Sequence, residues 1–314
     1  MKCWLLSDID LESLRKKKDS VDEFYVKLAN SVGNLPEWCE MVNIFDICIE
    51  VDNNQQDTIF YKGKRVQRPD VALCFYIGGT SFGVQDPDNI RLRILDQLQM
   101  LGTHCIQSSS QLTSTSDKLK SAQILAAAGI KVPATILVTN SVTPKYIVDN
   151  LGLPVVVKPN DGTEGIGVCL IKTEEELKSY MDKRDRSTTL IAQQYISTSC
   201  GRDLRIAMLG DEIIYAMERD NTKNGDFRSN ISQGGIVHIF TPSAEAIDIA
   251  RKSMKTMGLN ICSVDLLYGK DCFFVGEVNS IPGYAEGQTY EGEDVTKRYQ
   301  RLLGEYMMKI MQKK

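Results

Sequence analysis

The segment VVVKPNDGTEGIGVCLI (155–171) combines one lysine with three closely spaced glycines. The three valines predict a buried strand that ends near Lys158, and the following loop contains Gly162, Gly165 and Gly167. Glycines let backbone N–H groups approach oxygen atoms closely, so such a loop can cover phosphates. The loop joins two strands and opens no helix, which distinguishes it from a Walker A loop and a Rossmann fingerprint. The alternative is a flexible hairpin with a solvated lysine.

Two later apolar stretches carry carboxylate and amide side chains. Asp265 lies in CSVDLLY (262–268), and Glu277 and Asn279 lie in FFVGEVNS (273–280). Residues two apart in a strand point to one face, so a hairpin of these strands could bring the three side chains together. Such oxygen donors suit Mg²⁺. The alternative is that the acids end the strands and face solvent, but buried acids in apolar strands are costly unless paired or metal-bound.

A third segment supplies arginines. Asp203 and Arg205 alternate along one predicted strand, and Arg219 ends the next strand. Arg228 and Asn230 follow a polar loop. Arginines on strands that line a cleft can clamp a phosphate or carboxylate group. For each arginine alone, a surface salt bridge is the competing interpretation.

Strands and helices alternate over the first part of the chain, which predicts a small α/β domain over 1–108. The expected elements are strands at 3–6, 41–51 and 71–79, a hairpin at 57–66 turning at Lys62-Gly63, and helices at 11–29 and 90–101. The polar, serine-rich stretch 108–116 is predicted to be a linker.

The second part of the chain begins with a helix predicted over 117–128, with Ser116 as N-cap and Gly129 as C-cap. The elements expected after it are β-rich stretches at 134–172 and 188–240 around a helix in TEEELKSYMDKR, a helix at 243–257, strands at 261–268 and 272–279, and a helix at 295–312.

Composition excludes several classes of protein. The chain has 314 residues, 37 Lys and Arg against 41 Asp and Glu, and a net charge of −4. This balance argues against a protein held by nucleic acid or an anionic membrane. No apolar run reaches the roughly 18 residues of a membrane span, and the N-terminus does not resemble a signal peptide, so we expect a cytoplasmic protein. Nine cysteines without a CxxC pair, and only His104 and His238, predict reduced thiols and no zinc site.

Seven motifs occur in order between about 114 and 284, and together they resemble the ATP-grasp ligases. The motifs are SDKLKSAQILAAAGIKVPAT, VVVKPNDGTEGIGV, AQQYI, GRDLRIAMLGDEIIYAMER, GDFRSN, SVDLL and EVNSIPG. Within that superfamily they are similar to the RimK type, the ribosomal-protein glutamate ligases and their relatives. The resemblance implies an α/β (α+β) chain with a preATP-grasp domain at 1–108, a central ATP-grasp subdomain with the glycine-rich lid at 109–190, and a C-terminal subdomain with the Mg²⁺ site at 191–314.

The resemblance also implies roles for residues. The nucleotide-binding set that it implies is Lys118, Lys158, Gly162, Gly165, Gly167, Gln193, Gln194, Tyr195, Ile196 and Asp203. The catalytic set is Arg228, Arg219 and Asn230, and the metal ligands are Asp265, Glu277 and Asn279. In these sets the two lysines contact phosphates, 193–196 is the adenine hinge, and Asp203 faces the ribose.

The implied activity is ATP-dependent ligation of a carboxylate with an amine through an acyl phosphate. The expected cofactors are ATP with Mg²⁺ or Mn²⁺, and the expected substrates are an amino acid and a peptide, protein or small-molecule acceptor, with no nucleic acid and no membrane. The resemblance also suggests a homodimer or tetramer. Two alternatives keep the same fold: a small-molecule kinase, and a non-catalytic ATP-binding module.

Two positions depart from the RimK pattern. Gln233 and Tyr76 stand where the subgroup commonly has arginine. The stretch 282–294 is also longer and more acidic than is usual there. We therefore expect a substrate other than the ribosomal protein, and we expect this stretch and the N-terminal domain to select the amine.

Overall fold

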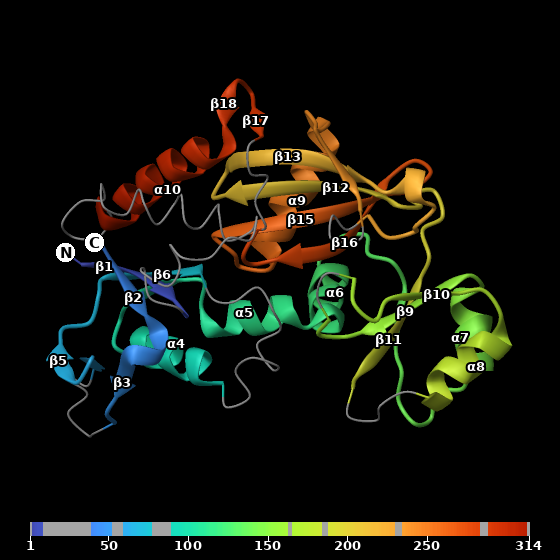
Figure 1. The fold of residues 1–314 in the computed structure, drawn as a ribbon, viewed down its shortest axis with the longest axis horizontal. Helices are drawn as coiled ribbons and strands as arrows, with labels where there is room; N and C mark the ends of the chain where they lie inside the picture. The colour runs from blue at the N-terminus through green and yellow to red at the C-terminus, as the bar shows by residue number, and fades with distance from the viewer. Residues whose placement is uncertain are drawn as a thin grey trace.

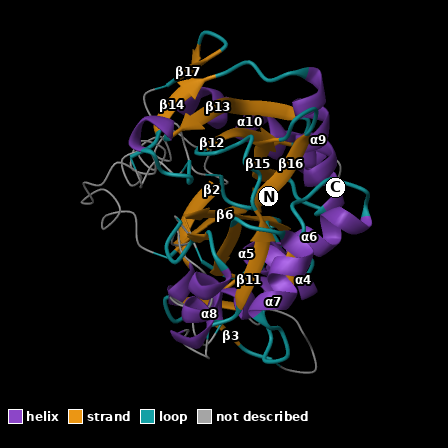
Figure 2. Ribbon diagram, turned by 90° about the vertical axis from the view of Figure 1, so that its right-hand side faces the viewer, coloured by secondary structure: helices purple, strands orange, loops and turns teal. Residues whose placement is uncertain are grey.

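Three main β-sheets organise the chain, with the C-terminal sheet lying above the other two (Figures 1 and 2). The computed structural model describes residues 2–8, 39–51, 59–76, 89–162, 165–183, 188–229, 234–282 and 288–312. The helix predicted at 11–29 lies outside these residues. Among the residues that are described, no helix combines the length and the apolar character needed to cross a bilayer.

The N-terminal sheet is parallel, with strand order β2-β1-β6-β7. Its strands are β1 (Cys3–Ser7), β2 (Cys39–Asn43), β6 (Val71–Tyr76) and β7 (His104–Ile106). Strand β1 is buried on both faces, as expected for a parallel sheet. Trp4 and Leu6 pack in the core of this domain, whereas Cys3 and Leu5 belong to a core shared with the C-terminal sheet.

The prediction of one strand at 41–51 is wrong. The chain turns at η1 (Ile44–Asp46), where the Asn43 side chain accepts a hydrogen bond from the Phe45 amide, and continues as β3 (Ile47–Ile49). The predicted hairpin is confirmed as β4 (Ile59–Tyr61) and β5 (Lys64–Val66), and β4 also pairs with β3 to give a small sheet of order β3-β4-β5. At its turn, Lys62 and Gly63 both have positive φ.

Three helices follow β6: the first lies between the sheet strands β6 and β7, and the other two connect β7 to the rest of the chain. α4 (Ile90–Met100) confirms the helix expected at 90–101. The predicted linker is instead helix α5 (Ser109–Ser116), which begins with a capping box between Ser108 and Gln111. α6 (Lys118–Ala127) follows at once, capped by Asp117 rather than by the predicted Ser116.

The central sheet is antiparallel, with strand order β10-β9-β11-β8. Its strands are β8 (Thr135–Leu137), β9 (Val155–Pro159), β10 (Cys169–Ile171) and β11 (Leu190–Gln194). Helices α7 (Pro144–Leu151) and α8 (Glu174–Lys183) share its hydrophobic core through Ile147 and Leu177. The predicted boundary between the two ATP-grasp subdomains, at 190, falls at the start of β11, which belongs to this sheet. Helix α7 interrupts the stretch 134–172, which was predicted to be β-rich.

The C-terminal sheet is also antiparallel, with strand order β14-β13-β12-β15-β16. Its strands are β12 (Arg202–Leu209), β13 (Glu212–Asp220), β14 (Ile236–Ile239), β15 (Ile261–Tyr268) and β16 (Phe273–Asn279). The remaining elements are η2 (Thr222–Asn224), α9 (Ala244–Thr256), β17 (Thr289–Tyr290), β18 (Glu293–Asp294) and α10 (Val295–Gln312). α9, α10 and the N-terminal sheet bury its apolar side chains in one core.

Alternation along these strands leaves a polar face opposite that core. Leu204 and Ile206 belong to the core, so the residues between and beside them point to the other face. The register places these residues together on the polar face: Asp203, Arg205, Arg219, Ser263, Asp265, Glu277 and Asn279. This face is the one that carries the predicted chemistry.

Candidate active site

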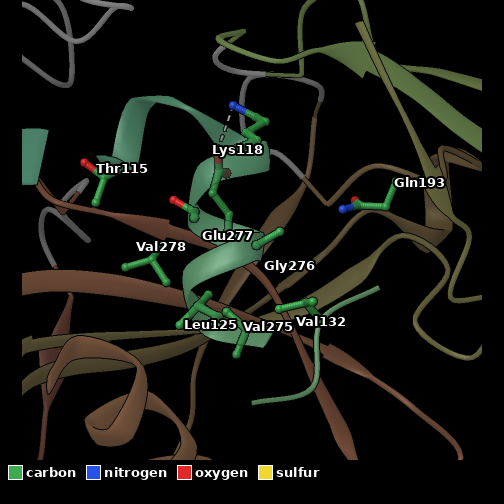
Figure 3. Close-up of a pocket in the computed structure, with 11 residues that line it drawn as sticks. Thr115, Lys118, Leu125, Val132, Gln193, Val275, Gly276, Glu277 and Val278 are labelled. Atoms are coloured by element: carbon green, nitrogen blue, oxygen red, sulfur yellow. Dashed lines mark ion pairs between the residues drawn. The ribbon is translucent and has the colours of Figure 1, made fainter. Parts of the chain in front are cut away.

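A pocket lies where α6, β16 and the central sheet meet (Figure 3). Its apolar part is formed by Ala122, Leu125, Val132, Val275 and Val278, and its polar part by Thr115, Lys118, Ser121, Gln193 and Glu277, with Gly276 completing it. Three of the predicted site residues, Lys118, Gln193 and Glu277, therefore line one cavity. Their arrangement combines an apolar wall with groups that bind phosphate or metal.

Lys118 is the first residue of α6, and two contacts fix it there. The Asp117 side chain caps the helix, and Asn160 accepts hydrogen bonds from the backbone amides of Lys118 and Leu119 at 3.1 and 2.9 Å. The Lys118 ammonium group lies 3.0 Å from a Glu277 carboxylate oxygen, as the dashed line in Figure 3 marks. It also donates to the carbonyl oxygen of Gly162, so the first turn of α6 ties the glycine-rich loop to the C-terminal sheet.

Lys158 lies near the end of β9, on the central sheet. Its Nζ donates to Gln193 Oε1 at 2.9 Å, and Gln193 Nε2 donates to Thr135 Oγ1 at 3.0 Å. Burial lowers the pKa of Lys158 to about 8; the nearby Glu277 carboxylate opposes this shift, and the Lys118 ammonium adds to it. A desolvated ammonium group between a cation and an amide is well placed to receive an anionic ligand.

Glu277 and Asp265 are direct partners on β16 and β15, as the predicted hairpin requires. Burial alone would raise the pKa of Glu277, but the charges of Lys118 and Lys158 and the hydrogen bond from Lys118 together outweigh it, and the net shift of the pKa is downward. Glu277 therefore stays ionised near neutral pH. Its carboxylate is one third exposed toward the pocket, whereas the Asp265 side chain is only 6% exposed.

Asp265 also belongs to a buried network of four charged side chains. Arg205 forks onto Asp265 through Nε and Nη2, both at 2.7 Å. Arg219 forks onto Asp203 and also donates from Nη2 to Asp265 Oδ2 at 2.8 Å. Burial by itself would raise the pKa of Asp265, but the two arginines lower it to about 2. Asp203 also accepts from Ser229 at 2.6 Å, so its contacts in this structure go to protein groups, and its predicted contact with a ribose stays a prediction.

Arg205 was named among the possible clamping arginines but is absent from the predicted nucleotide, catalytic and metal sets, although its place in the network is central. The signal in the sequence is that Arg205 lies two residues after Asp203 in the same strand, so that both side chains point to one face. Its partner depends on the pairing of β12 with β15, where Arg205 stands directly opposite Asp265. That register joins strands about 60 residues apart, and local periodicity does not reveal it.

Arg228 lies at the far side of the glycine-rich loop. Asp226 accepts from its Nε at 3.1 Å and from its Nη2 at 2.8 Å, while Nη1 donates to the carbonyl oxygen of Gly165 at 3.1 Å. The hydrogen bonds to Asp226 raise the pKa of Arg228 further. Tyr180 donates to the carbonyl oxygen of Gly167 at 3.2 Å. Asn230 lies outside the described residues.

The predicted hinge follows directly from β11. Gln194 ends the strand, exposed, and Tyr195 stacks edge-on against Phe227 with ring centroids 6.3 Å apart. Ile196 is buried. Burial raises the pKa of Tyr195 to about 12, so its hydroxyl stays neutral. The hinge thus links the central sheet to the loop that carries Arg228.

The predicted metal ligands fit Mg²⁺ by donor type. Asp265, Glu277 and Asn279 present oxygen atoms from adjacent strands on one face. Asn279 Nδ2 and the neighbouring Ser263 hydroxyl are buried without a hydrogen-bond partner, so this end of the face has polar atoms left to satisfy. Within the described ranges, no three His, Cys, Asp or Glu side chains gather as a metal site. The predicted metal site therefore needs the amide oxygen of Asn279 as its third ligand.

Two antiparallel sheets with a pocket between them, lined by Lys118 and with Lys158 close by on the central sheet, are the arrangement of the ATP-grasp class of fold. The solved structure of the ATP-grasp ligase PsnB, complexed with minimal precursor, Mg and ADP, superposes with a TM-score of 0.67 and 15% identity over 97% of this chain and 98% of that one. This similarity shows the fold.

Sequence comparison then identifies the family. The RimK-like ATP-grasp domain matches residues 115–303. A probable alpha-L-glutamate ligase of Citrobacter koseri is 35% identical over 77% of this chain and 78% of its own length. A ribosomal protein bS6–L-glutamate ligase of Shigella boydii is 32% identical over 85% of this chain and 87% of its own length. The chain belongs to the RimK-like ATP-grasp family, and it is an ATP-dependent carboxylate–amine ligase. Ligases of this class use ATP and Mg²⁺.

Proposed function

We propose that the chain joins the amino group of an amino acid to a carboxylate of a peptide, protein or small-molecule acceptor. The observation that carries this proposal is that Lys118 and Glu277 line one pocket and pair with each other, while Lys158, from a third element, donates to Gln193 in the lining of that pocket and lies near both charges. Two lysine cations beside Glu277, with Asp265 directly opposite Glu277 on the next strand, match a triphosphate with its divalent metal. Phosphoryl transfer depends on such positioning more than on covalent help from the protein.

In the first step, an acceptor carboxylate oxygen attacks the γ-phosphorus of ATP, the bond to the β–γ bridging oxygen breaks, and ADP leaves. The amine then attacks the acyl carbon, inorganic phosphate leaves, and the amine loses a proton. Lys118 and Lys158 bind the phosphates, and Arg228 stabilises the charge on the transferred group. Asp265, Glu277 and Asn279 would hold Mg²⁺ or Mn²⁺, which would neutralise phosphate charge.

Because an acyl phosphate hydrolyses in water, the site needs a cover. We assign this role to the loop 160–167. Lys118 holds the carbonyl oxygen of Gly162, and Arg228 holds that of Gly165. Two of the three proposed phosphate-binding cations, Lys118 and Arg228, therefore also contact the loop. Binding of a triphosphate would thus be coupled to the position of the loop.

Glutamate is the first amino acid to test, since both relatives named above are glutamate ligases by name. We propose an acceptor other than ribosomal protein S6, because Gln233 and Tyr76 replace arginines of the subgroup pattern. Tyr76 ends β6, and Gln233 lies outside the described residues. Size-exclusion chromatography of the purified chain tests the predicted homodimer or tetramer.

The proposal is tested by screening the twenty amino acids against candidate acceptors for ADP release, with mass spectrometry of the products. Hydroxylamine is added in parallel, because an acyl phosphate yields a hydroxamate and a phosphorylated hydroxyl does not. We expect a hydroxamate and a product heavier by one amino-acid residue. Phosphate transfer to a hydroxyl without hydroxamate would instead establish a kinase, and nucleotide binding without ADP release would establish a non-catalytic module.

A further inference from the structure

The guanidinium group of Arg205 is directed wholly at one predicted metal ligand. It forks onto both oxygens of Asp265 at 2.7 Å, and the two side chains are 14% and 6% exposed. A planar fork on a carboxylate fixes its orientation more firmly than a single hydrogen bond does. Among the contacts within the described part of the chain, every hydrogen bond of this guanidinium goes to Asp265.

The neighbouring Arg219 is held differently. It forks onto Asp203 and reaches Asp265 through one additional bond of 2.8 Å from Nη2. If Asp265 turned one oxygen toward a metal, Arg219 would keep its bonds to Asp203. If Oδ2 is the oxygen that turns, Arg205 keeps the bond from its Nε to Oδ1, whereas the bond from Arg219 to Asp265 is lost. The geometry therefore separates a permanent counter-ion of Asp265, which is Arg205, from an exchangeable one, which is Arg219.

The charges around the two carboxylates sum to a positive value. Asp265, Glu277 and Asp203, which shares Arg219, contribute −3, and Arg205, Arg219, Lys118 and the nearby Lys158 contribute +4, which leaves +1. In a partly buried site such charges are weakly screened. A bare divalent cation is therefore disfavoured here, whereas a metal that arrives on a triphosphate brings its own negative charge.

We propose that Arg205 is a positioning residue for Asp265, which holds the carboxylate in orientation and prevents it from binding a divalent metal before nucleotide is present. This inference rests on the proposed metal ligation by Asp265 and Glu277. It makes metal binding depend on nucleotide, which goes beyond the assignment of the ligands themselves.

The test compares two substitutions that separate charge from geometry. Arg205→Met removes the charge, and Arg205→Lys keeps the charge but removes the fork. Binding of Mn²⁺ to the full chain is measured by electron paramagnetic resonance without nucleotide and then with ADP. Arg251→Met, an exposed arginine beside Asp211, serves as the control, and thermal denaturation checks that each variant is folded.

Without nucleotide, we expect Arg205→Met to bind Mn²⁺ at least tenfold more tightly than the unmodified chain, and Arg205→Lys to stay within about twofold of it. Arg205→Lys should lower kcat with little change in KM for ATP, because Asp265 is no longer held in orientation. Equal changes of Mn²⁺ affinity in both variants, or no change in either, would overturn the inference. If Arg205→Met does not fold, Arg205→Gln takes its place with the same expectation.

Asp265→Asn separates failure of this inference from failure of the proposed metal site. If it abolishes Mn²⁺ binding in the presence of ADP while Arg205→Met changes nothing, the ligand assignment holds and the role of Arg205 is refuted. If Asp265→Asn leaves Mn²⁺ binding with ADP unchanged, the proposed metal site itself is wrong, and the inference about Arg205 falls with it.

Discussion

Replacing Lys158 by methionine removes its ammonium group while nearly keeping the length of the side chain. In the structure this group donates at 2.9 Å to Gln193, which lines the pocket, and it is buried near the second lysine, Lys118. A hydrogen bond to a charged group contributes about 1.5–3 kcal/mol, and about 1.4 kcal/mol corresponds to a factor of ten. We therefore expect kcat/KM for ATP to fall about 10- to 100-fold in Lys158→Met.

The pH dependence of the same parameter gives a second readout. Binding requires the protonated, charged form of Lys158, and burial has lowered its pKa to about 8. The cation is thus present below pH 8 and is lost as the pH rises through 8, so kcat/KM should fall about tenfold per pH unit above it. An arginine stays protonated at these pH values, so Lys158→Arg should remove this alkaline decline even if its activity is lower.

The assay is ADP release at limiting ATP from pH 6 to pH 10, with Lys145→Met as the control. Lys145 is an exposed lysine on α7, with a side chain 72% accessible, and its loss should leave kcat/KM unchanged. An alkaline decline that persists in Lys158→Arg would refute the assignment, as would Lys158→Met with the activity of the control.

Three further predictions concern other parts of the site. Glu277→Gln breaks the ion pair to the first residue of α6 and removes a proposed metal ligand, so the Mg²⁺ concentration for half-maximal rate should rise at least ~10-fold; an unchanged Mg²⁺ titration contradicts the assignment. Asp203→Asn leaves the buried Arg219 with one carboxylate partner fewer, so urea denaturation should show a loss of about 3 kcal/mol; a loss below ~1 kcal/mol would show that the network is not structural. Gly167→Ala places a Cβ 3.0 Å from a proline ring at φ +72° and should lower kcat severalfold, whereas Gly63→Ala, at φ +74° with open space around it, should lower stability only. Equal kcat in both glycine variants argues against a lid.

The sequence predicted the acidic hairpin well because its information is local. Asp265 and Glu277 lie in apolar strands joined by a short turn, and the observed register pairs them directly. Lys158 before the glycine-rich loop is equally local. Arg205 was named as a possible clamping arginine, but its pairing with Asp265 was not predicted, because the order of strands in the sheet fixes that partner and is a property of the whole fold.

Two helices were missed for different reasons. α5 has the composition SSQLTSTS, which is typical of a loop, yet Ser108 and Gln111 form a capping box and Leu112 enters the core. α7 had readable signals, with Thr143 as N-cap and Pro144 at the first helical turn, but its valine and isoleucine favoured a strand. In both cases burial against neighbouring elements decided the structure over local propensity.

A crystal structure of the chain with Mg²⁺ and a non-hydrolysable ATP analogue tests the central claim most directly. We predict a triphosphate lying between Lys118 and Lys158, with the Lys118–Glu277 contact of 3.0 Å opened and the metal held by Glu277, Asp265 and Asn279. A nucleotide bound elsewhere, or phosphates out of reach of both lysines, would contradict the proposed mechanism.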